Sequence, residues 1–300
     1  MTGSSTKAII YALSANFAIF VAKAVAAFIT KSGSMVAEAI HSFADCGNQL
    51  LLLLGMKRST LPANKSHPLG YGKVIYFWSF IVAVMLFSLG GLFSIWEGIH
   101  KLTTPEPIHQ AWIALSVIGI SVIIELSSLL GALKEIKHIR GKRTFFDWVK
   151  NTRSSELIVV LGEDIAAVIG LVLAFIFVGL ATIFNNPIYD AMGSISIGVI
   201  LLIVSGFLLV RMKSLLIGKS AEPELHDAIE NIIKSHKEIE KVFNVITIQV
   251  GPYIMLAAKI NIKDGVKIEQ ACEIINDLEK ELKNNIPEIK WSFIEPDVED

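Results

Sequence analysis

The sequence predicts an α-helical membrane protein with six transmembrane helices, followed by a small α+β domain in the cytoplasm. Two observations support this fold class. Only 18% of the 300 residues are charged, compared with about a quarter in soluble proteins, and 53% are hydrophobic. The composition becomes polar near residue 221, so we expect a transmembrane domain of residues 1–220 and a C-terminal domain of residues 221–300.

Six apolar segments are long enough for a membrane-spanning helix, which needs roughly 20 residues. The fifth segment is longer than a span requires, so we expect its helix to be tilted or to protrude from the bilayer. No later segment is long enough to span. The six segments cover residues 8–30, 34–56, 74–96, 111–133, 157–184 and 187–210.

Basic residues indicate how these segments are oriented. Lysine and arginine are concentrated after the second, fourth and sixth segments, whereas the loop at Asn185 and Asn186 has none. Loops rich in these residues stay in the cytoplasm, so both termini are predicted to be cytoplasmic. The first segment is too long for the apolar core of a signal peptide, and we expect it to be retained as a helix.

The C-terminal region predicts the order α-β-β-α-β, which is that of a ferredoxin-like α+β domain with its helices on one face of the sheet. Glu222, Pro223 and Glu224 favour the start of the first helix. About 80 residues is short for an independent domain, and dimerisation would add buried area, so we expect a homodimer. The predicted elements cover residues 222–237, 242–250, 253–262, 266–285 and 289–294.

Composition and motifs exclude several functions. The net charge of −1 provides no field that would attract nucleic acid. The sequence has no glycine-rich phosphate loop, no paired CxxC and no G-x-S-x-G, so no prosthetic group is expected. Cys46 falls in an apolar segment and Cys272 in the polar C-terminal region, so a disulfide between them is not expected.

His41 and Asp45 lie in the middle of the second apolar segment. Their spacing of four residues puts both side chains on one face of a helix, a face that Asn48 shares. Ionisable residues inside a bilayer are costly and mark ion or proton paths, and imidazole and carboxylate are good ligands for divalent transition metals. The alternative is a polar patch that joins two helices.

Glu163 and Asp164 form an acidic pair in the fifth segment. Two adjacent carboxylates in an apolar helix are prohibitive when both are ionised and unpaired, so a cation or protons must neutralise them. Together with His41 and Asp45 they can complete a four-coordinate Zn²⁺ site, with ligand distances of about 2.0–2.2 Å. The alternative is a cluster of protonated acids that hydrogen-bond between helices.

Three further polar residues lie in the apolar segments. Glu125, in the fourth segment, is predicted to be a ligand, a proton relay or the partner of Lys23 in the first segment. Asp190 lies near the start of the sixth segment, where we expect it to cap that helix or to stand at the outer mouth of a path.

These features resemble the cation diffusion facilitator family over almost the whole chain. Several stretches are most similar to the branch that contains the mitochondrial-type zinc transporter. Because residues 1–7 are too short for a transit peptide, we expect a multi-pass protein of a bacterial inner membrane. The stretches that carry the resemblance are His41-Ser-Phe-Ala-Asp-Cys-Gly-Asn-Gln49, His67-Pro-Leu-Gly-Tyr71, Glu163-Asp-Ile-Ala-Ala-Val-Ile-Gly170 and Asn186-Pro-Ile-Tyr-Asp-Ala-Met-Gly-Ser194.

The resemblance implies a homodimeric exporter of Zn²⁺, or of Fe²⁺, Co²⁺ or Mn²⁺, that works by proton antiport with alternating access. It also implies a metal site of His41, Asp45 and Asp164. The position that usually supplies a second histidine is Val160, which cannot bind metal, so we expect Glu163 to be the fourth ligand, with water or Asn48 as alternatives.

Many members of the family that this sequence resembles bind regulatory zinc in the cytoplasmic domain. The comparable positions in this sequence are Asn244, Lys259 and Glu295-Pro-Asp297, so a binuclear zinc centre is not expected. Two other functions stay open. An intramembrane zinc hydrolase needs similar ligands, although the usual His-Glu-x-x-His is missing, and a scaffold or regulator that does not transport would use the cytoplasmic domain alone.

Overall fold

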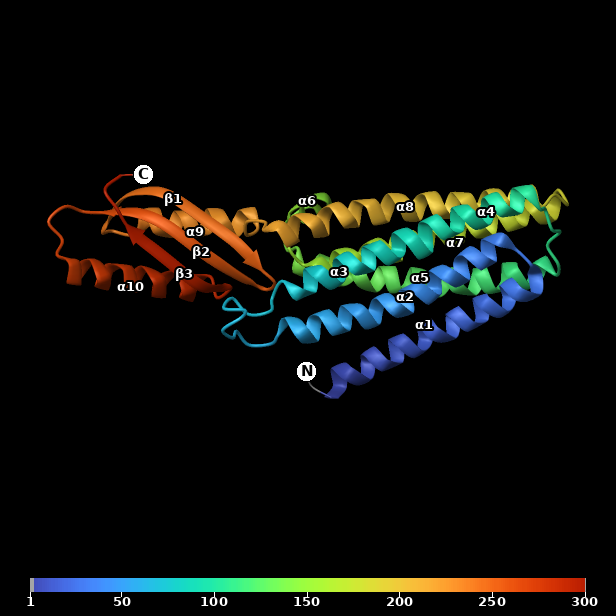
Figure 1. Cartoon of the computed structure of the whole chain (residues 1–300), viewed down its shortest axis with the longest axis horizontal. Coiled ribbons are helices and arrows are strands. Elements are labelled where there is room, and N and C mark those ends of the chain that lie inside the picture. Colours follow the sequence, from blue (N-terminus) through green and yellow to red (C-terminus); the bar gives the residue numbers. More distant parts are fainter. Residues whose placement is uncertain (1–2, 300) are drawn as a thin grey trace. The chain divides into compact units, whose positions relative to one another are not determined.

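The computed structural model describes residues 3–299, with side chains from Asn16 onward. The chain forms two compact units (Figure 1). The first, which we call the helical unit, contains residues up to 55, 77–142 and 156–212. The second, which we call the α/β unit, contains residues 56–76, 143–155 and 213–300.

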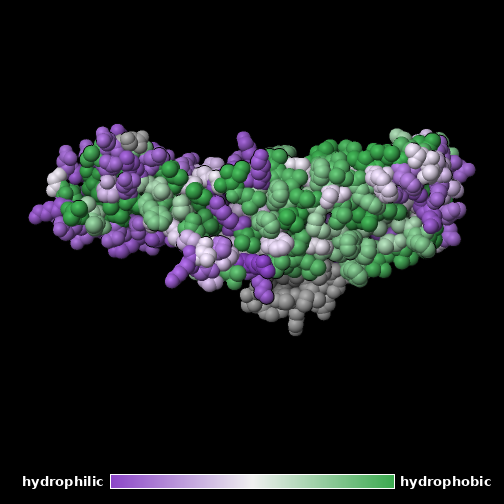
Figure 2. Space-filling model, viewed as in Figure 1, coloured by the Kyte–Doolittle hydropathy of each residue, from purple (hydrophilic) through white to green (hydrophobic). Residues whose placement is uncertain are grey.

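All six segments predicted to span the membrane are helical. The helices begin and end at α1 (Gly3–Thr30), α2 (Gly33–Ser59), α3 (Val74–Met85), η1 (Leu86–Leu92), α4 (Phe93–Thr103), α5 (Ala111–Ile139), α7 (Ser155–Ile183) and α8 (Ile188–Ile217). Within the described residues, four continuous helices are long and apolar enough to cross a membrane, namely 74–103, 111–139, 155–183 and 188–217. Figure 2 shows apolar residues over much of the helical unit, with polar residues gathered at its ends.

The third predicted helix is longer than expected, because it continues without a break through α3, η1 and α4 to Thr103. The middle segment, η1, is π-helical, a local widening of the helix. Glycines let this helix pack closely on α8. A Cβ added at Gly98 would lie 2.8 Å from the backbone oxygen of Ala191, and one added at Gly198 would lie 2.8 Å from that of Gly91. Small residues allow such close backbone contact between membrane helices.

Asp190 does not cap its own helix, contrary to the prediction. Its carboxylate accepts hydrogen bonds from the backbone N–H groups of Gly33 and Ser34 and from the hydroxyl of Ser32, so it caps the first turn of α2. The side chain of Asn186 accepts instead from the backbone N–H of Ile188, the first residue of α8. The first N–H groups of a helix have no partner within it, and α8 supplies the acceptor that α2 needs.

The α/β unit confirms the predicted order α-β-β-α-β. Its elements are α9 (Pro223–Ser235), β1 (Ile239–Val250), β2 (Tyr253–Ile262), α10 (Ile268–Asn285) and β3 (Ile289–Pro296). The sheet order is β1-β2-β3, with β1 and β2 antiparallel and β2 and β3 parallel. Helices α9 and α10 cover one face (Figure 1), and their residues Ile229, Ile233, Leu278 and Leu282 form the core with buried residues of the sheet.

Two loops pack within the same unit. The basic loop between α5 and α7 contains a short helix, α6 (Phe145–Asn151), that was not predicted, and its Trp148 is fully buried. After it, the guanidinium of Arg153 donates to the backbone oxygens of Ser220 and Ala221. The loop between α2 and α3 is held by Tyr76, whose hydroxyl donates to the Gly251 oxygen at 3.1 Å.

Candidate metal centre

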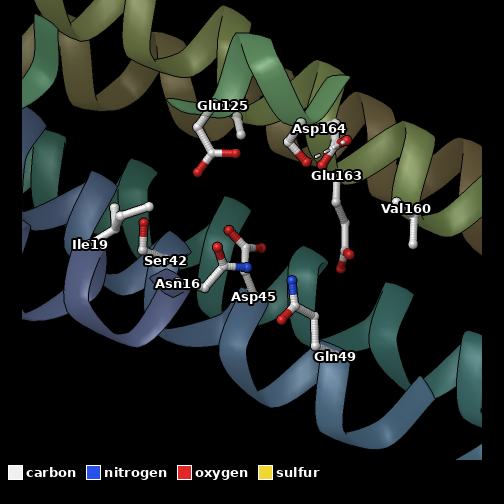
Figure 3. A pocket seen from close by; sticks show the side chains of 11 residues that line it. Asn16, Ile19, Ser42, Asp45, Gln49, Glu125, Val160, Glu163 and Asp164 are labelled. Atoms are coloured by element: carbon white, nitrogen blue, oxygen red, sulfur yellow. Dashed lines mark hydrogen bonds between the residues drawn. The ribbon is translucent and has the colours of Figure 1, made fainter. Parts of the chain in front are cut away.

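A polar cavity of about 80 Å³ lies among four helices of the helical unit (Figure 3). Helix α2 contributes polar side chains spaced three or four residues apart, which is the spacing of one helix face. Helix α7 contributes its acidic pair one turn after Val160. The lining residues are Asn16 and Ile19 of α1, Ser42, Asp45 and Gln49 of α2, Glu125 and Ser128 of α5, and Val160, Glu163, Asp164 and Ala167 of α7.

The carboxyl groups of Asp45, Glu125, Glu163 and Asp164 line this cavity from three different helices (Figure 3). Such groups repel one another when they are all ionised, and burial in an apolar bundle strengthens the repulsion. The arrangement is therefore stable only when protons or a cation neutralise the negative charge. A divalent cation and protons can compete for the same oxygen atoms.

Neutral side chains hold two of these acids. The Asn48 amide donates to Glu163 Oε1 at 2.5 Å, and the Ser128 hydroxyl donates to Asp164 Oδ2 at 3.3 Å. Asp45 Oδ1 is buried and has no hydrogen-bond partner among the described residues. Buried polar atoms normally have partners, so this oxygen is available to a cation or a proton.

His41 is fully buried but does not line the cavity. Its Nε2 lies 3.7 Å from Asp45 Oδ2, so the two side chains approach each other as their spacing predicts. Neither ring nitrogen has a hydrogen-bond partner within the described part of the chain. An imidazole with both nitrogens free inside a protein is unusual, and it can receive a proton or a metal ion without breaking a hydrogen bond.

The four residues predicted to bind metal are not assembled into one coordination shell. Among residues 3–299, no group of three or more His, Cys, Asp and Glu side chains is arranged to hold a metal ion. Asp45, Glu163 and Asp164 line the same cavity, whereas His41 lies close to Asp45 without lining the cavity. Glu125, for which the sequence is compatible with three roles, also lines the cavity.

Of the three roles expected for Glu125, the ion pair with Lys23 is contradicted, because Lys23 pairs with Glu38 instead. The Lys23 ammonium donates to Glu38 Oε2 at 3.0 Å and to the Ser42 hydroxyl at 2.8 Å, and the side chains of Lys23 and Glu38 are fully buried. No role for Glu38 is predicted from the sequence. Its spacing was the available signal, because Glu38 lies seven residues before Asp45 on the same face of α2.

In the α/β unit, Asn244 and Lys259 are opposite each other on β1 and β2. The Lys259 ammonium forms an ion pair with Asp297 Oδ2 at 2.8 Å. This hydrogen bond lowers the pKa of the Asp297 carboxyl. Lys259 therefore neutralises Asp297 at the positions where many members of the family that this sequence resembles bind regulatory zinc.

Two known sequence families match this chain. Residues 9–217 match the family described as "Cation efflux transmembrane domain", and residues 221–297 match "Cation efflux protein, cytoplasmic domain". Together the two matches cover most of the chain.

Several individual proteins are similar as well. The mitochondrial proton-coupled zinc antiporter SLC30A9 of Xenopus laevis is 36% identical over 247 residues, which is 82% of this chain and 44% of that protein. Metal tolerance protein C4 of Arabidopsis thaliana is 32% identical, over 83% of this chain and 55% of that protein. The manganese efflux system protein MneP of Bacillus subtilis is 23% identical, over 97% and 95%. The chain thus spans about half the length of the animal and plant relatives.

Proposed function

The chain belongs to the cation efflux family, and from this premise we propose that it exports a divalent metal cation, Zn²⁺ first, from the cytoplasm in exchange for protons. It is a multi-pass membrane protein. The proposed arrangement has six transmembrane helices and both termini in the cytoplasm. Residues 1–220 form the transport domain, and residues 221–300 form a cytoplasmic domain that joins two copies of the chain.

The observation that carries the proposal is the cavity lined by Asp45, Glu125, Glu163 and Asp164 inside a mostly apolar helical bundle. Carboxyl groups in such a place need a cation or protons, which are the two substrates of an antiporter. The names of two relatives, a proton-coupled zinc antiporter and a manganese efflux protein, support a divalent cation as the metal substrate.

The proposed metal ligands are His41, Asp45 and Asp164, with Glu163 as the fourth. Metal ligands must be deprotonated, so metal binding releases protons and a rise in proton concentration releases the metal. In the present structure His41 lies outside the cavity and Glu163 is bound to Asn48. Assembly of the four ligands therefore requires the side chains of His41 and Glu163 to reorient, and we propose that a movement of α2 and α7 accompanies this step and links metal binding to alternating access.

The ligand set also bears on the choice of metal. Imidazole suits Zn²⁺, whereas a site of carboxylates suits Mn²⁺ as well. Position 160, one turn before Asp164, is a valine and not a second histidine. The proposed site therefore has one imidazole and several carboxylates. We therefore propose Zn²⁺ as the main substrate, with Fe²⁺, Co²⁺ and Mn²⁺ as further candidates.

Metal uptake by proteoliposomes tests the proposal. The full chain is reconstituted, a pH gradient is imposed, and uptake of Zn²⁺, Mn²⁺, Fe²⁺ and Co²⁺ is followed at two pH values. We expect Zn²⁺ uptake that depends on the gradient and is abolished by Asp45→Ala and by Asp164→Ala. Asp264→Ala, at an exposed loop residue, is the control and should transport normally.

The outcomes separate the alternatives. Full uptake in Asp45→Ala or Asp164→Ala would remove that residue from the site. Zinc binding without uptake would favour an intramembrane hydrolase, and the absence of any metal binding by the purified protein would favour a scaffold. Uptake that is independent of pH would contradict the exchange for protons.

A further inference from the structure

The side chains that line the cavity continue for one further turn toward the N-terminal end of α2. Glu38, Ser42 and Asp45 are spaced four and three residues apart, so they lie on one face of this helix. On α1, Asn16 and Ile19 line the cavity and Lys23 follows one turn later. On α7, Ala167 lines the cavity and Gly170 follows three residues later. Lys23, Glu38 and Gly170 thus form the next layer beside the cavity.

Lys23 and Glu38 form an ion pair within this layer. The ammonium of Lys23 is bound by Glu38 Oε2 at 3.0 Å and by the Ser42 hydroxyl at 2.8 Å, and Ser42 itself lines the cavity. Only the side chain of Ser42 therefore separates the ammonium group of Lys23 from the cavity proposed for the metal. A divalent cation that leaves the cavity along this face of α2 meets an ammonium group, which repels it.

Glu38 keeps one carboxylate oxygen available. Its Oε1 is buried without a hydrogen-bond partner in the described chain. This oxygen points at α7, where a Cβ added to Gly170 would lie 2.9 Å from it. Glycine at this position leaves room for the carboxylate between the two helices. The carboxylate and the Ser42 hydroxyl are oxygen donors of the kind that a divalent cation accepts.

We propose that Lys23 and Glu38 form the outward gate of the transport path and that Glu38 is the next carboxylate to receive the departing cation. This inference rests on the proposed export of a divalent metal. The ammonium of Lys23 holds Glu38 while the cavity fills. When the flexible lysine side chain turns away, both Glu38 oxygens and the Ser42 hydroxyl are free for the metal, and the return of the ammonium displaces it.

A purely structural ion pair behaves differently under substitution. Replacing both partners of a buried pair by neutral residues of similar size is often harmless, whereas removing one partner leaves an unpaired charge. The decisive variant is therefore the double substitution Lys23→Met and Glu38→Gln. Zinc binding to the purified full chain and zinc uptake by proteoliposomes are measured for it, with Ser205→Ala in α8 as the control for loss of a buried polar group.

We expect the double variant to bind zinc with a dissociation constant close to that of the unmodified chain and to lose about tenfold or more of its uptake rate. Lys23→Met alone should bind one additional Zn²⁺ per chain, because Glu38 has lost its ammonium partner. Uptake by the double variant at the rate of the unmodified chain would overturn the gate, as would an unchanged zinc stoichiometry in Lys23→Met.

Gly170→Ala provides an independent check that changes no charge. The added methyl group takes the space of Glu38 Oε1, so we expect slower uptake with unchanged zinc binding. Unchanged uptake in this variant would contradict a role for that oxygen. If the unmodified chain neither binds nor transports zinc, the proposed function fails; if it transports and the double variant does too, only the gate fails.

Discussion

Replacement of Asp190 by alanine should destabilise the helical unit strongly. The carboxylate accepts hydrogen bonds from the N–H groups of Gly33 and Ser34 and from the Ser32 hydroxyl, and all four residues are buried. Alanine leaves these donors unpaired at the start of α2. An unpaired buried donor costs about 1–3 kcal/mol, and the lower value for each of the three donors gives the minimum loss. The expected loss in the free energy of unfolding is about 3 kcal/mol.

Equilibrium unfolding of the full chain in detergent micelles, followed by tryptophan fluorescence, measures this loss. Asp190→Asn is the matched control, because its amide oxygen can still accept the hydrogen bonds of Ser32 and Ser34, whereas its NH2 group cannot accept from Gly33. We expect this variant to lose about 2 kcal/mol, of which about 1 is the contribution of the charge near a helix N-terminus and about 1 is the unpaired N–H of Gly33. An Asp190→Ala variant within about 0.5 kcal/mol of the unmodified chain would refute the reasoning.

Three further predictions concern packing, acid stability and metal choice. Gly98→Ala should lose about 1–3 kcal/mol in the same unfolding assay, because its Cβ meets a backbone oxygen of α8, whereas Gly179→Ala, with no atom of the described chain within 4 Å, should not. Lys259 lowers the pKa of Asp297, so the pair stabilises the α/β unit above the unfolded-state pKa of about 3.9 and this contribution disappears as the pH falls through the folded-state pKa. Hydrogen exchange of β3 should become less sensitive to acid in Asp297→Asn; equal sensitivity would contradict this. Val160→His should tighten zinc binding about tenfold with a smaller effect on Mn²⁺, as calorimetry can test, and an unchanged zinc-to-manganese ratio would argue against this position as a ligand.

Most of the fold could be predicted because its signals are local. Apolar length predicts each of the six helical segments, and the helix and strand patterns after residue 221 predict the α-β-β-α-β order that the structure contains. The errors lie where packing overrides local pattern. The helix that ends at Thr103 continues past the predicted end at Trp96, because glycines let its later turns pack closely on α8. Helix α6 was missed because its buried Trp148 lies in a loop rich in basic residues.

The candidate site was predictable only in part. The spacing of His41 and Asp45 correctly places them together on α2, and the acidic pair of α7 correctly indicates a second helix at the same place. The sequence indicates that Glu125 is a buried acid but leaves its role open, and the structure places Glu125 in the lining of the cavity. Glu38 could be found only from its position seven residues before Asp45 on the same helix face, and this signal is weak because the sequence does not show how far the buried part of that face extends.

The sequence by itself determines which residues are apolar, which helices form and which side chains share a helix face, because these properties depend on neighbours within a few positions. Only the tertiary structure decides which faces meet. It pairs Lys23 with Glu38 and turns Asp190 toward the first turn of α2. It also places His41 next to Asp45 but outside the lining of the cavity. The physical reason is that the partner of a buried polar group depends on the rotation and depth of each helix against the others, and the packing of the whole bundle sets both.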